Sequence, residues 1–186
     1  AFSLLAGQAR PAFLLHCEVA PAGTLISCRP DAGRSALTAN LSYVDCEAAL
    51  AGEEGAANPA VPYLDRLRMG LAFAEARQKR RVAEGAVIIE KPDVDISLSG
   101  EGADIEVELE PAPSTPNAQL LVSEMMILAN AGLAMWAKEQ QVPLLYRTQD
   151  VVVPREFAGV WRSAPDIARV VRAMAPASLD TMPRPH

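Results

Sequence analysis

The stretch LLVSEMMILAN at residues 120–130 lies in a longer apolar segment that decides the fold. Thr115 is a good N-cap and Pro116 stands where the first helical residue would be, so a long helix is expected to begin there. Two polar side chains, Ser123 and Glu124, interrupt its apolar residues. Because burying an unpaired charge is costly, the carboxylate of Glu124 must be satisfied or used. For a glutamate in this setting, a structural hydrogen-bonding role is more common than a catalytic one.

A second helix is predicted over residues 63–84, with Gly85 as a plausible stop. Its apolar side chains recur at the spacing of one helix face and form the predicted buried stripe of Leu64, Leu67, Leu71 and Ala74. At about 100° per residue, a second set of side chains should gather on another face of the helix, namely Arg66, Arg77 and Arg80.

The helix ends in RQKRR at residues 77–81, which places four cations in five residues. Cations complement the carboxyl-terminal end of a helix dipole, so a solvated helix terminus is the plain interpretation. In a chain with excess acid, however, this basic cluster makes phosphate contact credible. Arg80 and Arg81 are the candidates for that contact.

The remaining segments predict an α+β fold of mixed or antiparallel sheets with packed helices. The expected strands cover residues 11–19 and 24–29 as a hairpin, then 35–43, 86–90, 93–99 and 104–110. A short helix is expected over 45–50, with further helices around 156–162 and 166–174. The last strand alternates apolar and acidic residues, a pattern typical of a sheet with one solvated face and one buried face.

Composition excludes several classes of protein. Half of the 186 residues are hydrophobic and the net charge is -6, which argues against a generic nucleic-acid binder held by bulk positive charge. A channel enzyme with a few inward-facing cations stays possible. No apolar run reaches about 18 residues, so no membrane partner is expected.

The three cysteines form no CxxC motif and indicate a reducing cytosol. Cys17 and Cys28 could lie near each other across the hairpin, although spacing alone cannot establish a bond.

Asp93 and Asp95, with Asp104 nearby, resemble a metal site at first sight, since carboxylate pairs bind Mg²⁺. Strand positions i and i+2 share one face, here the expected solvated one, so an acidic outer face is the favoured interpretation.

Tyr43 stands between a predicted strand and helix, where aromatics usually pack. If it is exposed, it could stack on a nucleic-acid base. The residues alone therefore give a weak case for binding a polyanion.

Five blocks of the sequence, in this order, are similar to the catalytic (RNB) domain of the ribonuclease II/R exoribonucleases. These blocks are FSLLAGQARPAFLLHCEVAPAGTL (2–25), LTANLSYVDCEAAL (37–50), RVAEGAVIIEKPDVDIS (81–97), LLVSEMMILAN with VPLLYRTQ (120–130 and 142–149), and SLDTMPRPH (178–186). The helix block is the most specific, and its spelling resembles the cyanobacterial and plastid branch of the family. The resemblance covers essentially the whole chain.

The resemblance implies roles for several residues. Tyr43 matches a tyrosine that contacts RNA and helps to favour ribose. Ser123 stands where many relatives carry the first of two glutamates, which contacts RNA near its 3′ end, and Glu124 matches the second. Ile89 occupies the position of an aromatic that often clamps the terminal base. With Arg80 and Arg81 behind them, these are the expected RNA-binding residues.

The resemblance also implies that residues 1–186 are the middle-to-late part of one RNB domain. The expected activity is processive, Mg²⁺-dependent 3′→5′ hydrolysis of single-stranded RNA to nucleoside 5′-monophosphates. The aspartates that hold Mg²⁺ and the arginine motif TSPxRRY are expected outside this segment, so no catalytic or metal residue is assigned within it. Flanking OB-fold or other RNA-binding domains and a cytoplasmic location are expected. The alternatives are a degenerate relative that binds RNA without cleaving it and a structural α+β module.

Overall fold

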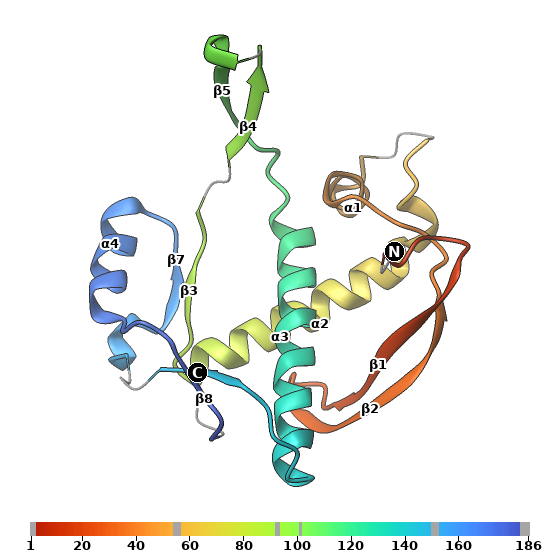
Figure 1. The fold of residues 1–186 in the computed structure, drawn as a ribbon, viewed down its shortest axis with the longest axis vertical. Helices are drawn as coiled ribbons and strands as arrows, with labels where there is room; N and C mark the ends of the chain where they lie inside the picture. The colour runs from red at the N-terminus through yellow and green to blue at the C-terminus, as the bar shows by residue number, and fades with distance from the viewer. Residues whose placement is uncertain (1–2, 54–56, 92–93, 101, 150–152, 183–186) are drawn as a thin grey trace.

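The structure, a computed structural model, describes all residues except 1–2, 54–56, 92–93, 101, 150–152 and 183–186. Its central element is helix α3 (Pro116–Glu139), against which two other helices and a β-hairpin pack (Figure 1). The predicted long helix is therefore confirmed. By length and apolar composition this helix would also suit a membrane span, although Ser123 and Glu124 interrupt its apolar residues. In this fold it packs against both helices and both hairpin strands.

The start of α3 is held by a neighbouring helix. Thr115 occupies the N-cap position but its side chain makes no capping hydrogen bond. Glu47 of helix α1 (Tyr43–Ala51) does so instead, because its Oε2 accepts from the backbone N–H of Ala118 at 3.0 Å. Its Oε1 accepts from the Asn117 side chain at 2.7 Å. A carboxylate at a helix N-terminus satisfies free N–H groups and complements the helix dipole.

Helix α2 (Leu64–Ala83) crosses α3 and follows a single turn of 3-10 helix, η1 (Val61–Tyr63). The predicted helix over 63–84 is confirmed. The two helices lie close together at Gly70, where a Cβ atom would lie 3.2 Å from a methyl carbon of Leu121. The buried positions on α2 are Ala74 and, against expectation, Arg77.

Strands β1 (Ala9–Val19) and β2 (Leu25–Ala36) form the predicted hairpin, whose register places Cys17 opposite Cys28. The third strand predicted over 35–43 is wrong. Pairing with β1 carries β2 on to Ala36, and only an isolated bridge at Leu37 follows. The chain then turns into α1, because the Ser42 side chain accepts from the backbone N–H of Asp45 and caps the helix.

Strands β4 (Val94–Ser99) and β5 (Glu106–Pro111) form an antiparallel ribbon that projects from the body, with the turn η2 (Gly102–Asp104) at its tip (Figure 1). The prediction that one face of this sheet is buried is wrong. Ile96, Leu98 and Leu109 are 66%, 69% and 64% exposed. Alternation correctly separates an apolar face from an acidic face, but no described element covers the apolar one.

The remaining strands are short. β3 (Val87–Ile89) pairs in parallel with β7 (Gly159–Trp161), and β6 (Tyr146–Thr148) pairs antiparallel with β8 (Ser178–Asp180). The helix predicted around 156–162 is wrong, since a short turn, η3 (Arg155–Phe157), leads directly into β7. The helix predicted over 166–174 is confirmed as α4 (Ala164–Ala173). Small sheets with packed helices confirm the α+β class.

Candidate functional site

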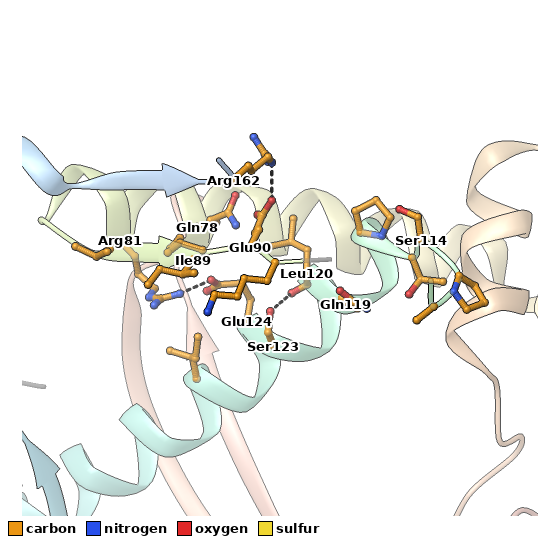
Figure 2. Close-up of a pocket in the computed structure, with 18 of the residues that line it drawn as sticks. Gln78, Arg81, Ile89, Glu90, Ser114, Gln119, Leu120, Ser123, Glu124 and Arg162 are labelled. Atoms are coloured by element: carbon orange, nitrogen blue, oxygen red, sulfur yellow. Dashed lines mark hydrogen bonds and ion pairs between the residues drawn. The ribbon is translucent and has the colours of Figure 1, made fainter. Parts of the chain in front are cut away.

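A cavity of about 830 Å³ lies where α2, β3, α3 and the segment 111–115 meet (Figure 2). Its polar lining residues are Gln78, Arg81, Glu90, Lys91, Ser114, Thr115, Gln119, Ser123, Glu124 and Arg162. Its apolar lining includes Val87, Ile88, Ile89, Leu120 and Ile127. The cavity therefore combines an apolar wall with several cations.

Four of the six predicted RNA-binding residues meet at this cavity, namely Ile89, Arg81, Ser123 and Glu124. The other two, Tyr43 and Arg80, are not among its lining residues. Figure 2 shows Ser123 and Glu124 on α3 facing Ile89 and Arg81.

Glu124 forms the floor of this site and is only 1% exposed. Its Oε1 accepts a hydrogen bond from Nη1 of Arg81. The Nε atom of Arg77 lies 3.7 Å from Oε2, so two guanidinium groups neutralise the buried carboxylate. A buried charge that is paired in this way no longer carries the cost of an isolated one.

The prediction from the sequence placed Arg77 on the wrong face of α2. It follows Ala74 by three residues, so it extends the apolar stripe of α2 toward α3 and is 6% exposed. Its Nη1 donates to the carbonyl oxygen of Gly23 at 2.9 Å. Burial lowers the pKa of Arg77, while the Glu124 carboxylate acts in the opposite direction. Arg77 thus joins α2, α3 and the hairpin turn.

Arg80 is directed away from the cavity. Its Nη1 donates to Oγ1 of Thr24 in the hairpin turn, and its Nη2 lies 2.8 Å from the carboxylate of Glu84. Arg77 and Arg80 therefore hold two neighbouring residues of the turn, Gly23 and Thr24, while Arg81 alone of the three lines the cavity.

Ser123 is exposed, in contrast to the neighbouring Glu124. Its hydroxyl donates to the carbonyl oxygen of Leu120 at 3.0 Å, which leaves its lone pairs available as acceptors. On the opposite wall, Ile89 of β3 presents an apolar surface. A flat apolar or sugar-like group could therefore lie between a hydroxyl and an aliphatic side chain.

Sequence reasoning missed two cations of the cavity, Lys91 and Arg162. Arg162 follows strand β7, and its Nε lies 2.7 Å from Oε2 of Glu90 next to strand β3. The parallel pairing of β3 with β7 creates this contact across 72 residues of sequence. No local motif signals it. Only Arg77 had a detectable signal, its spacing from Ala74.

Tyr43 begins α1 and is 47% exposed, as the stacking hypothesis requires. It lies one turn before Glu47, the residue that binds the N-terminus of α3. Tyr43 is therefore on the helix beside the start of α3, from which Pro116 and Gln119 line the cavity.

Within the part of the chain that the structure describes, no group of three or more His, Cys, Asp or Glu side chains could hold a metal ion. Asp95 lies opposite Glu110 on the exposed ribbon. Asp93 and His186 lie outside the described residues.

Comparison with known proteins identifies relatives of this architecture. The family model described as RNB domain matches residues 1–184. An active-site mutant of the Dss1 exoribonuclease from Candida glabrata superposes with a TM-score of 0.76 at 19% identity, covering 98% of this chain and 26% of that one. RNase R of Mycoplasma genitalium, in complex with ribose-methylated single-stranded RNA, gives a TM-score of 0.71 at 14% identity, covering 99% of this chain and 33% of that one.

The same RNase R in complex with double-stranded RNA gives a TM-score of 0.65 at 15% identity, covering 79% of this chain and 25% of that one. The chain thus spans about a quarter to a third of the length of these solved structures. No curated protein sequence matches it.

Proposed function

Because this chain belongs to the RNB domain family, we propose that it is the middle-to-late part of the catalytic domain of a processive 3′→5′ exoribonuclease. The substrate would be single-stranded RNA and the products nucleoside 5′-monophosphates. The observation that carries the proposal is the cavity at Ser123, where an exposed hydroxyl, the apolar wall of Ile89 and the guanidinium of Arg81 come together. RNA-bound RNase R among the structural neighbours supports an RNA ligand.

Each side of the cavity suits one part of a nucleotide. The Ser123 hydroxyl can accept a hydrogen bond from a ribose 2′-hydroxyl, the group by which proteins distinguish RNA from DNA. Arg81, Lys91 and Arg162 line the cavity and would contact phosphate oxygens. Because Ile89 is aliphatic, it would pack against a base or sugar but would not form an aromatic stacking contact. Tyr43, exposed on α1, is proposed to stack on a base of the approaching strand.

Glu124 and Arg80 act on RNA indirectly in this proposal. Glu124 is buried and its carboxylate fixes the guanidinium of Arg81 at the cavity wall. Arg80 holds the hairpin turn through Thr24. Both are thus positioning residues for the groups that reach the ligand.

Among the described residues, no group of three or more His, Cys, Asp or Glu side chains is arranged to hold a magnesium ion. The proposed chemistry is metal-assisted attack of water, with ligands supplied from outside these residues. No catalytic residue is assigned within this segment. Its contribution is binding and orientation of the RNA.

The decisive experiment uses the full-length protein with Mg²⁺ and a 5′-labelled single-stranded RNA. Shortening of the labelled RNA from its 3′ end supports the exonuclease. Intermediate lengths that stop shortening when an excess of unlabelled RNA is added would contradict processivity. Ser123→Ala should weaken discrimination between an RNA and the matched DNA, while the unfolding midpoint stays unchanged. Asn130→Ala, on the exposed side of α3 outside the cavity lining, is the matched control.

A second candidate is a relative that binds RNA without cleaving it. It is favoured by Ser123 and Ile89, which stand where related sequences carry an acid and an aromatic side chain. Retention of the labelled RNA without shortening, at the same protein concentration and Mg²⁺, would support this candidate. Flanking RNA-binding domains are also proposed, and a cytosolic location is proposed because the three cysteines form no CxxC motif.

A further inference from the structure

Two thiols face each other across the β1–β2 hairpin. Cys17 and Cys28 are direct partners in the antiparallel register, and their Sγ atoms lie 3.6 Å apart. Both are free thiols. Opposed residues in an antiparallel pair have Cα atoms roughly 4.5–5.5 Å apart, which is within the span that a disulfide bridges.

Helix α3 covers this pair. A Cβ atom added to Gly132 would lie 2.7 Å from Sγ of Cys28 and 3.4 Å from Sγ of Cys17. The two sulfur atoms therefore occupy the contact between the hairpin and the central helix. Cys28 is only 8% exposed, whereas Cys17 is half-buried. Small reagents in solvent consequently reach the pair through Cys17.

We propose that Cys17 and Cys28 form a redox-active dithiol, a modification site that a peroxide converts into a cross-strand disulfide beneath α3. This inference goes beyond the proposed function, because it requires neither RNA nor the cavity. Closing the bond needs an approach of about 1.5 Å between sulfur atoms that already touch, since a disulfide is about 2.05 Å long. Rotation of the two side chains can supply such a movement.

The chemistry balances with a peroxide as the named oxidant. The Cys17 thiolate attacks one peroxide oxygen, the O–O bond breaks, and a sulfenic acid and hydroxide form. The sulfur of Cys28 then attacks the sulfenic sulfur, forming the S–S bond and releasing water. Two electrons pass from the sulfur atoms to the peroxide.

Burial and the neighbouring Cys17 raise the pKa of Cys28 to about 11, so Cys28 is protonated at neutral pH. Cys17 is the more exposed of the two thiols, so it is the expected site of first attack and Cys28 is the resolving thiol. Direct contact between the sulfur atoms compensates for the low thiolate fraction of Cys28 by proximity.

Cys46 provides an internal control. It is half-buried on α1, and burial together with Asp45 and Glu47 raises its pKa. No thiol contact to Cys46 occurs among the described residues. It should therefore stay a thiol under conditions that join the other two.

The test treats the full-length protein with increasing hydrogen peroxide, blocks free thiols with a light alkylating reagent, and then reduces and labels with a heavy one. Before reduction, peptide mass spectrometry should find the Cys17 and Cys28 peptides linked. After reduction with dithiothreitol these two cysteines should carry the heavy label and Cys46 the light one. The cross-link should also raise the unfolding midpoint by roughly 5 °C, because it constrains the unfolded chain.

Two variants distinguish a redox-active dithiol from two cysteines that only pack in the core. Cys46→Ser should leave the cross-link unchanged, whereas Cys28→Ser should lead Cys17 onward to sulfinic acid, because no resolving thiol remains. The proposal is overturned if the folded wild-type protein forms no Cys17–Cys28 link. It is equally overturned if all three thiols disappear at the same rate. Both results are read from the wild-type chain, so neither depends on a variant that folds.

Discussion

Arg77 and Glu124 face each other across the interface of α2 and α3, with Nε 3.7 Å from Oε2 and side chains that are only 7% and 2% exposed. Neither of these two atoms has a hydrogen-bond partner among the described residues. The pair is therefore held by charge more than by hydrogen bonding, and Arg81 supplies the hydrogen bond that Glu124 receives. The main role of the buried carboxylate is therefore to hold α2 and α3 together.

Replacing Glu124 by alanine should lower the free energy of unfolding by about 3 kcal/mol, because Arg77 would keep a buried and uncompensated charge. Urea unfolding monitored by circular dichroism measures the change. RNA affinity should fall as well, since Arg81 loses the contact that fixes it at the cavity wall.

The matched control for this prediction is the neighbouring residue on the same helix. Ser123→Ala removes an exposed hydroxyl and should change the unfolding free energy by less than about 0.5 kcal/mol. If both variants lose the same stability, or if Glu124→Ala unfolds like the wild type, the structural role of Glu124 is refuted.

Gly23 in the hairpin turn should not tolerate a side chain. Its φ of +82° is strained for other residues, and a Cβ atom would lie 3.0 Å from Cα of Arg77. Gly23→Ala is expected to cost about 2–3 kcal/mol, combining backbone strain with overpacking against the backbone of α2. Thermal and urea unfolding would measure this loss.

A variant at Gly52 separates the cost of backbone strain from the cost of overpacking. Gly52 has a similar φ of +79°, but a Cβ atom there would meet nothing within 4 Å. Gly52→Ala should therefore cost only about 1 kcal/mol, the strain alone. Equal losses in the two variants would show that the contact between the turn and Arg77 contributes nothing.

Local signals account for what the sequence predicted correctly. The helices α2 and α3 follow from apolar spacing with a proline at the start of one and a glycine after the other, and the hairpin follows from two apolar runs around the segment 20–23. These features need no knowledge of distant partners. The family resemblance named Ser123, Glu124 and Ile89, and the basic cluster named Arg81; the structure places all four at one cavity.

Contacts between distant segments explain the features that could not be predicted from the sequence. Helical spacing grouped Arg77 with Arg66 and Arg80 on a face away from the apolar stripe, and the Glu124 carboxylate on α3 compensates the charge of the buried Arg77. Arg162 reaches the cavity through the pairing of β3 with β7, which no local pattern indicates. Alternation in β5 predicted two chemically different faces, but whether another element covers one of them is not encoded in the strand itself.

Gly132 also lies at a close contact, which the side chain of Cys28 makes. In an exposed helix a change from glycine to alanine would stabilise by about 1 kcal/mol. In Gly132→Ala the Cβ atom would meet Sγ of Cys28 at 2.7 Å. We expect a net loss of about 1–3 kcal/mol, because the hairpin must shift away from α3.

Two comparisons test this explanation. Gly70→Ala faces only the methyl end of Leu121 at 3.2 Å and should be close to neutral. Adding Cys28→Ala to Gly132→Ala removes the sulfur and should recover part of the lost stability, giving a non-additive cycle. Strict additivity of the two changes would contradict a direct contact.

The thiol of Cys28 should make stability depend on pH in the alkaline range. Its pKa rises from 9.0 to about 11 on folding, through burial first and the Cys17 thiol second. Between about pH 9 and pH 11 the unfolded chain loses this proton while the folded chain keeps it. The contribution of Cys28 is thus complete below about pH 9 and is lost as the pH rises toward 11. Urea unfolding under reducing conditions should show a steeper loss for the wild type than for Cys28→Ala. Parallel losses over this range would show that the thiol is not shielded by α3.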